Sequence, residues 1–501
     1  MSKTEYWRVW FVILGAAAVS FLSTTPFVFI AGVAFGAVVT SNLLGTDVKG
    51  RLASFWLLLL LFPPITFSLD GIAGINRIVE LNHSRVLVLI LLLPAALSLL
   101  GNRDIKIPSS MRWMDVLVLS YPVFKLAAAV PSSPLTVTLR MSVETFLDLV
   151  LPYYVTTRGL RSASDLKFVV APMAVGLVYL ALVGLLESVL RKNVYSELQF
   201  IYGVRWQLTH VLMRGPFLRI QATTPQPIVM AFLMLCGFGM WSWLRATGTV
   251  LASHGRLIAL ILFAAFFATW SRGPLLGFMG FLLCLAALRR MVPMKFLALV
   301  CFLVMVGGLA TAAGADSYLY TGLKTLFGSA EADVSSIDYR RKLLETSLAL
   351  IEQSPIWGVP NYASYMQDLR QGEGIVDLVN TYLAVTLSAG LVGLALFLSP
   401  HLLVLYRLLK TIGPASERPR LLGGSFPIAF ASLTIAALFV IFTTSDFSFV
   451  SSMLLFIVAV PTAWLAMSRE EQKLSDAHEA VANAPKGRRA TIPAYVDHGA
   501  W

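Results

Sequence analysis

Charged residues are scarce in this sequence. Asp, Glu, Lys and Arg make up 13% of its 501 residues, whereas hydrophobic residues make up 57%. Soluble domains are roughly 45–50% apolar and about 25% charged. A soluble fold could not bury so large an apolar excess, so the scarcity of charge excludes that class and predicts a polytopic membrane protein.

Cysteine and acidic residues are also few. The three cysteines, Cys236, Cys284 and Cys301, all lie inside apolar runs, so we expect no structural disulfide and no metal site. The 27 acidic residues leave a formal net charge of +12. Because the basic residues are scattered between hydrophobic runs, as topology signals are, we expect no nucleic-acid partner.

Apolar runs recur along most of the chain. A hydrocarbon core of about 30 Å needs about 20 apolar residues in a helix. The first run, which starts at Phe11, lacks a small-residue cleavage site and is interpreted as a retained helix. We expect an all-α polytopic membrane protein of about 12–14 transmembrane helices, from runs at 9–23, 26–43, 54–69, 85–100, 114–130, 140–156, 167–186, 225–244, 256–270, 274–288, 295–314, 378–399, 424–443 and 447–466.

The basic residues predict an orientation. Most of the 39 Lys and Arg residues fall in segments that are cytoplasmic if the N-terminus is cytoplasmic. Both termini are therefore predicted inside, and both long loops outside. The expected parts are N-terminal transmembrane helices over 1–314 with an outer loop at 187–224, a large periplasmic loop at 315–377, C-terminal transmembrane helices over 378–467 and a disordered cytoplasmic tail at 468–501.

The long loop contains a helix signal. The stretch "SSIDYRRKLLETSLALIEQSP" starts with Ser and Asp and stops at Pro355. Its apolar positions Ile337, Leu344, Leu348 and Ile351 follow a helical period. This pattern predicts an amphipathic helix that lies over the membrane surface as a cap.

Polar residues gather at the predicted outer ends of several spans. They are Ser271 and Arg272 in "TWSRG", Arg340 and Arg341 in the loop helix, Asp377 and Asn380 before the next span, and Arg214 and Arg219 in the other long loop. Guanidinium groups bind phosphate bidentately and keep their charge. Several arginines beside a hydrophobic interior therefore predict a site for a lipid-linked phosphate.

Each of these features also has a simpler structural interpretation. Arg272 could anchor a hairpin by snorkelling, and Arg340 or Arg341 could belong to a solvated helix face. Asn380 could be a helix N-cap and nothing else. Gly390 and Gly393 are interpreted as residues that let helices approach closely.

An ionisable group of residues lies inside the predicted spans. Arg140, Glu144 and Asp148 are spaced i, i+4, i+8, and Lys125 is in the preceding run. Intramembrane ionisable residues are functional candidates. Because this spacing allows mutual neutralisation along one stripe, we favour an internal ion-pair network over a transport pathway.

The ordered motifs of residues 210–400 resemble the O-antigen ligase and polymerase superfamily of bacterial envelopes. They are "TWSRG", then Arg340 followed by "LLETSLALIEQSPIWGV", then "NTYLAVTLSAGLVG". Two departures are Val379, where the family has His, and Pro360, where it has a second Gly. The ligase branch depends on that His for catalysis and the polymerase branch tolerates other residues, so the resemblance favours the polymerase branch, including exopolysaccharide polymerases.

The resemblance implies a GT-C-like membrane glycosyltransferase in the bacterial inner membrane. Its donor would be a glycan on undecaprenyl pyrophosphate, and its acceptor a hydroxyl of another lipid-linked unit. It implies no metal and no cofactor, and it suggests membrane lipids, a chain-length regulator and a flippase as partners. The implied catalytic residues are Arg272, Arg340, Asp377 and Asn380, and the implied substrate-binding residues are Arg214, Ser271, Arg341 and Tyr382.

Asp377 lies three residues before Asn380 and is expected on the same helix face, as the general base. Three alternatives remain open. A ligase would transfer the same donor to a lipid A core acceptor. A transporter or flippase would favour internal repeats, which the sequence does not show convincingly. A non-catalytic assembly scaffold is the third.

Overall fold

The structure is a computed structural model. It describes residues 3–70, 77–102, 109–195, 198, 212–214, 216–248, 254–289, 331–370, 376–412, 425–445 and 448–482. The span expected at 295–314 lies outside the described residues, as do the first part of the loop at 315–330 and the end of the tail.

Helices account for most of the described chain. They are α1 (Lys3–Leu22), α2 (Pro26–Leu44), α3 (Val48–Leu61), α4 (His83–Leu87), η1 (Val88–Leu92), α5 (Leu93–Gly101), α6 (Ser109–Ala129), η2 (Val130–Ser132), α7 (Leu135–Thr145), η3 (Phe146–Val150), α8 (Leu151–Gly159), α9 (Ala163–Leu190), α11 (Pro227–Ala246), α12 (Gly255–Ala268), α13 (Arg272–Leu288), α16 (Glu331–Gln353), η6 (Tyr362–Tyr365), η7 (Gln367–Leu369), α17 (Thr381–Thr411), α18 (Ser425–Val440), η9 (Ile441–Thr443) and α19 (Ser448–Ala482).

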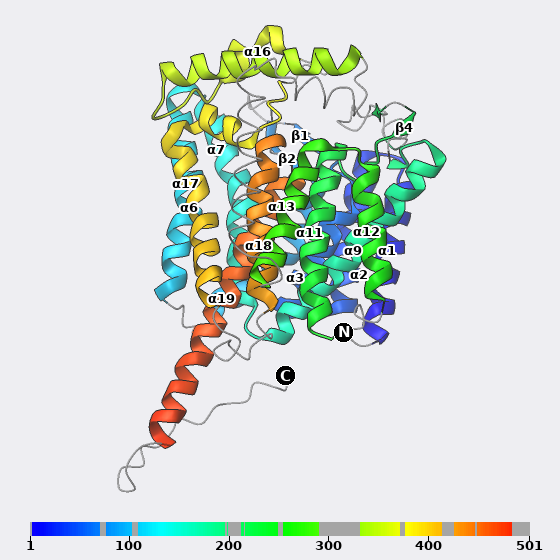
Figure 1. The fold of residues 1–501 in the computed structure, drawn as a ribbon, viewed down its shortest axis with the longest axis vertical. Coiled ribbons are helices and arrows are strands. Elements are labelled where there is room, and N and C mark those ends of the chain that lie inside the picture. The colour runs from blue at the N-terminus through cyan, green and yellow to red at the C-terminus, as the bar shows by residue number, and fades with distance from the viewer. Residues whose placement is uncertain are drawn as a thin grey trace.

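These helices form a bundle of roughly parallel and antiparallel elements (Figure 1). Within the described residues, nine helices are long and apolar enough to cross a membrane, and α12 and α13 are shorter apolar helices. The prediction of an all-α polytopic membrane protein is confirmed. The most enclosed helices are α11 and α19, with 89% and 83% of their apolar windows buried, so they form the centre of the bundle.

One expected span is shorter than its apolar run. The run at 54–69 forms α3 only as far as Leu61, and Pro63 and Pro64 follow at once. Proline lacks the N–H that a helix interior needs. The chain instead enters an antiparallel hairpin of β1 (Thr66–Asp70) and β2 (Arg77–Asn82).

Two spans contain a π-helical turn directly before a proline. The turn η1 precedes Pro94, and η3 precedes Pro152. A proline in a helix clashes with the carbonyl four residues earlier, and a wider turn relieves that clash. As a result α4, η1 and α5 form one continuous helix, which is among the nine candidate spans, and α7, η3 and α8 form a second continuous helix, which is not.

One end of the bundle carries the irregular structure. Figure 1 shows α16 lying across this end, with the β1–β2 and β3–β4 hairpins beside it, while the start of α1 and the end of α19 lie at the opposite end. The hairpin strands β3 and β4 are Met213–Arg214 and Phe217–Leu218. We call this end the cap face; it also includes the turn between α12 and α13, residues 376–380 and residues 441–445.

Candidate functional site

The cap helix α16 is amphipathic, as predicted, but it buries a different stripe. Among its described side chains, Leu343, Ser347 and Leu350 are buried and the expected Ile351 is half-buried. The expected Leu344 and Leu348 are 40% and 48% exposed, and the side chain of Ile337 lies outside the described part. The stretch "KLLETSLALI" offers two adjacent apolar stripes. Packing against a small core of the loop and α17, formed by Met366, Leu378 and Leu387, selects the first one.

The loop after α16 docks into a break in α17. Gly390 has φ 66° and ψ −173° inside α17, so the helix is kinked there. The freed backbone groups bond to the loop: Leu391 N donates to Pro355 O at 2.8 Å, and Val359 N donates to Leu387 O at 2.5 Å. Gly358, with φ 74°, lies against this kink. Gly358 and Gly390 therefore form one joint that attaches the loop after α16 to α17.

This joint has no room for a side chain. A Cβ at Gly390 would overlap the Ile356 carbonyl, and one at Gly358 would lie 2.6 Å from Gly390 N. The conformation is one that only glycine adopts readily. The interpretation of Gly390 as a simple helix-contact residue is therefore incomplete, because its backbone conformation matters more than its small size.

We expect Gly390→Ala to loosen the cap. Backbone strain alone costs about 1–3 kcal/mol, and the overlap with Ile356 adds to it. Limited proteolysis of the purified protein should cut the loop after α16 faster than in the parent. The control is Gly280→Ala, since a Cβ there meets no atom within 4 Å. Equal cleavage of both variants would show that the joint does not hold the cap.

Asp377 is the centre of a hydrogen-bonded cluster on the cap face. Its Oδ1 accepts from the Ser445 hydroxyl and, at 3.2 Å, from Val379 N, and its Oδ2 accepts from Gln226 Nε2 at 3.4 Å. Ser445 Oγ also accepts from Val379 N at 2.9 Å. The three partners come from the starts or ends of three different spans, so the carboxylate is oriented from several sides.

A second cluster surrounds the turn between α12 and α13. Arg219 donates from Nε to Thr269 O at 3.1 Å and from NH2 to the Ser271 hydroxyl at 3.0 Å. Arg214 of β3 donates to Trp270 O at 2.6 Å. The two loop arginines thus hold the turn from which α13 starts, and Arg272 is the first residue of that helix.

Residues 441–445 connect the two clusters. Gly273 lies so close to Thr443 that a Cβ there would overlap the Thr443 hydroxyl. Two residues later, Ser445 donates to Asp377, and Thr381 Oγ1 donates to Thr444 O at 2.7 Å. The start of α13, the segment before α19 and the start of α17 therefore form one contiguous region of the cap face.

Glu187 fixes the loop that supplies Arg219 and Gln226. This side chain is fully buried at the end of α9. Its Oε1 accepts from Val194 N, and its Oε2 accepts from Gln221 N and Ala222 N, all at 2.9 Å. A buried carboxylate with three backbone donors satisfies groups that a loop would otherwise leave unpaired. Glu187 thereby holds in place the loop that carries Arg219 and Gln226.

Strained backbone also concentrates on this face. Among the described residues, non-glycine residues with positive φ are Arg191, Ala222, Trp270 and Val379, and all four lie in cap-face loops. For Val379 (φ 47°) the conformation is unusual because its side chain is β-branched. Such strain costs of order 1–3 kcal/mol per residue and is typical of functional sites.

The structure brings some of the predicted site residues together and leaves others apart. Ser271, Arg272 and Asp377 lie in the contiguous region just described. Arg340 lies on α16, but its side chain lies outside the described part. Arg341 is 76% exposed and pairs with Glu345 at 3.0 Å, as a solvated helix face would. The Tyr382 hydroxyl donates to Leu438 O of α18.

Asn380 is the N-cap of α17, since its side chain accepts from Leu383 N at 3.2 Å. The helix begins at Thr381, so Asp377 precedes it. The expectation that Asp377 and Asn380 share a helix face is wrong. Asp377 is oriented by Ser445 and Gln226 instead of by a helix.

The intramembrane ion-pair network exists with a different cation. Glu144 and Asp148 bind Arg85 of α4, at 3.0 Å and 2.7 Å. The spacing within one helix favoured Arg140 as the partner. Such spacing carries no information about a partner on a distant helix, such as Arg85. Gln226 and Ser445 were missed for the same reason, although both are polar residues that flank apolar runs at the predicted outer side.

These observations define a polytopic membrane protein with a helical cap over a hydrogen-bonded polar region. Residues 257–398 match the family model described as O-antigen ligase. The match runs from α12 into α17 and includes Ser271, Arg272, the cap helix and Asp377. The resemblance to the O-antigen ligase and polymerase superfamily is confirmed for this region. No curated protein matches the chain.

Among the described residues, no group of three or more His, Cys, Asp or Glu could hold a metal ion. Arg219 donates to Ser271, and Arg272 begins α13, so both arginines belong to the cap-face region that also contains Asp377.

Proposed function

We propose that this protein polymerises lipid-linked oligosaccharide units by glycosyl transfer at the cap face. The observation that carries the proposal is the Asp377 carboxylate, held by Ser445 and Gln226 in the same region as Arg272. The family match supports an activity of the ligase and polymerase type. The donor is a glycan on undecaprenyl pyrophosphate, and the acceptor is a sugar hydroxyl of a second lipid-linked unit.

The transfer needs charge stabilisation and positioning more than covalent chemistry, because pyrophosphate is already a good leaving group. Arg272 holds the pyrophosphate, with Arg340 of the cap as its expected partner. Arg219 and Arg214 keep the Arg272 turn in place through Thr269, Ser271 and Trp270. Bidentate guanidinium–phosphate contacts suit this task better than lysine would.

Asp377 acts as the general base. The acceptor oxygen forms a bond to the anomeric carbon of the donor, the bond from that carbon to the pyrophosphate oxygen breaks, and the hydroxyl proton passes to the Asp377 carboxylate. Asn380 caps α17, so its contribution is to fix the segment that carries Asp377. Tyr382 fixes the same helix against α18.

Val379 favours the polymerase over the ligase. It stands at the position of the family's histidine, and its N–H bonds to Asp377 and Ser445. In this chain the Asp377 carboxylate supplies the base in place of the imidazole of the family's histidine. A ligase that transfers glycan to lipid A core remains the second candidate, since the family match is described by that activity.

We expect Val379→His to leave polymer formation in place and to create no transfer to lipid A core. Histidine adopts positive φ more readily than valine, so the variant should fold. The assay supplies purified protein with undecaprenyl-pyrophosphate repeat units, with and without lipid A core, and separates the products on a gel. Glycan on lipid A core from the unmodified protein, without a ladder of lipid-linked polymer, would favour the ligase.

The same proposal sets the location and the partners. The cap face is periplasmic, both termini are cytoplasmic and the membrane is the bacterial inner membrane, as the positive-inside pattern indicates. A flippase that delivers the lipid-linked units and a regulator of chain length are the expected partners. A transporter is less favoured, because a docked cap with an oriented carboxylate suits a reaction better than a moving gate.

A further inference from the structure

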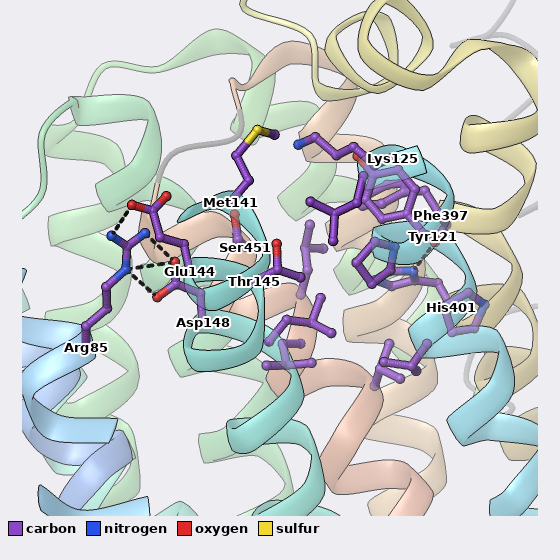
Figure 2. A pocket seen from close by; sticks show the side chains of 18 residues that line it. Arg85, Tyr121, Lys125, Met141, Glu144, Thr145, Asp148, Phe397, His401 and Ser451 are labelled. Atoms are coloured by element: carbon purple, nitrogen blue, oxygen red, sulfur yellow. Dashed lines mark hydrogen bonds and ion pairs between the residues drawn. The ribbon is translucent and has the colours of Figure 1, made fainter. Parts of the chain in front are cut away.

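A partly open cavity of about 310 Å³ lies between helices of the bundle. Its walls come from α6, α7 with η3, α17 and α19, and Arg85 of α4 closes one side (Figure 2). None of the described side chains of the proposed reaction site lines it. It is therefore a second space, and the reaction described above leaves it without a role.

Three of the polar residues that line the cavity lie near the cap face, whereas His401 lies 20 residues into α17 from that face (401 − 381). Lys125 lies four residues before the end of α6, Ser451 is the fourth residue of α19 and Arg85 is the third residue of α4. At a rise of 1.5 Å per residue, these positions are within about 6 Å of their helix ends. The apolar residues Leu454, Leu455 and Val458 line α19 further from the cap face.

The charges in the wall balance. Arg85 pairs with Glu144 at 3.0 Å and with Asp148 at 2.7 Å, and Figure 2 shows Lys125 on the other side, pointing across the cavity toward Met141. Among the described residues of the wall, two cations and two carboxylates sum to zero. The side chains of Glu144 and Asp148 are 22% and 41% exposed, and the Glu144 pair uses only its Oε1. These carboxylates can still accept hydrogen bonds from a ligand.

Two aromatic rings complete the wall. Tyr121 of α6 and Phe397 of α17 lie edge to face, with centroids 5.3 Å apart. Cationic donors, accessible carboxylate acceptors and aromatic faces together suit a polyhydroxylated ligand that is itself neutral. An anionic lipid phosphate fits less well, because the two carboxylates would repel it. The volume is at the lower end of ligand pockets, which span roughly 300–1,000 Å³, so the ligand is small.

A π-helical turn forms part of the cavity wall. Asp148 and Leu149 belong to the π-helical turn η3, and both line the cavity. A π turn re-aims the side chains of its helix and is frequent at functional sites. Here it lies opposite η1, the π turn of the span that carries Arg85.

We propose that this cavity is a saccharide-binding site that takes one or two neutral sugar rings of the glycan. Glu144 and Asp148 accept from sugar hydroxyls, Lys125 donates to them, and Phe397 and Tyr121 pack against a ring face. The identity of the glycan rests on the proposed function, but saccharide binding itself does not require turnover. The site holds glycan beside the reaction region and keeps it from returning to bulk water.

The test measures binding without catalysis. The probe is the repeat-unit oligosaccharide, released from its lipid carrier by mild acid and dephosphorylated, and the full-length protein is held in nanodiscs. Calorimetric titration should show binding to the parent protein. Glu144→Gln and Lys125→Met should each weaken it about tenfold or more, since each removes a hydrogen bond to a charged group.

The matched control is Arg140→Gln. Arg140 lies one turn before Glu144 on α7 but does not line the cavity, so its loss should leave binding unchanged. Binding should also persist in Asp377→Asn, which separates a failure of this proposal from a failure of the proposed reaction. A second measurement does not depend on the charge variants, some of which could fail to fold. Thr145 lines the cavity, so bound oligosaccharide should slow maleimide labelling of Thr145→Cys.

Three results would overturn the proposal. They are no binding by the parent protein, equal weakening by Arg140→Gln and the cavity variants, and a labelling rate at Thr145→Cys that the probe does not change. Undecaprenyl phosphate serves as the comparison ligand. If Lys125→Met weakens its binding and leaves the oligosaccharide unaffected, the cavity is a site for an anionic lipid.

Discussion

Asp377→Asn is expected to reduce polymer formation by about 10²–10⁴-fold, the usual contribution of a general base. The amide keeps the shape of the side chain and can still accept from Ser445 and Val379. It cannot take up the proton of the acceptor hydroxyl. The effect should therefore appear in the rate at saturating lipid-linked substrate, measured as the growth of a polymer ladder from purified protein.

The control for this variant is Asp368→Asn. Asp368 is exposed in η7 of the same cap loop, so a general loss of negative charge on the cap is tested without touching the cluster. It should form polymer at the parent rate. A normal ladder from Asp377→Asn would remove Asp377 from the mechanism, and an equal loss in both variants would assign the effect to the cap surface.

Arg272→Lys is expected to leave little or no polymer. Lysine keeps the charge but loses the planar fork that contacts two phosphate oxygens at once. Removing one such stabilising donor from a developing negative charge typically costs about 10²–10³-fold in rate. Because Arg272 is the exposed first residue of α13, the variant should insert and fold normally, as judged by gel filtration in detergent.

The matched control is Arg370→Lys, an exposed arginine in the cap loop. It should retain the parent activity. If Arg272→Lys also retains full activity, Arg272 only anchors the α12–α13 hairpin at the interface. The pyrophosphate would then have to be held by other cations of the cap face.

Hydropathy determined the class of the protein and most of the helices. The long apolar runs have no other stable arrangement than membrane-spanning helices, because backbone polar groups must be paired inside a bilayer. Local signals also worked where one residue acts on its neighbours. Asn380 caps α17, as one of its interpretations had it. The expectation of one helix over 54–69 is wrong, because α3 ends at Leu61 just before Pro63 and Pro64.

Prediction failed where the outcome depended on packing between distant segments. The cap helix has two apolar stripes, and contact with Met366 and Leu387 chose the one with Leu343 and Leu350. The sequence favoured a helix-contact role for Gly390. In the structure its positive φ opens α17 so that Leu391 N bonds to Pro355 O of the loop.

The sequence by itself determined the membrane class, the positions of most spans and the chemistry available at the cap face, since these depend on apolar length, charge and residue type. Only the tertiary structure decided which groups meet. Asp377 bonds to Ser445, 68 residues away in the chain (445 − 377), and to Gln226, 151 residues away (377 − 226). Glu144 pairs with Arg85, 59 residues away (144 − 85). No local pattern encodes such pairings, because they arise when helices pack and buried polar groups must find partners.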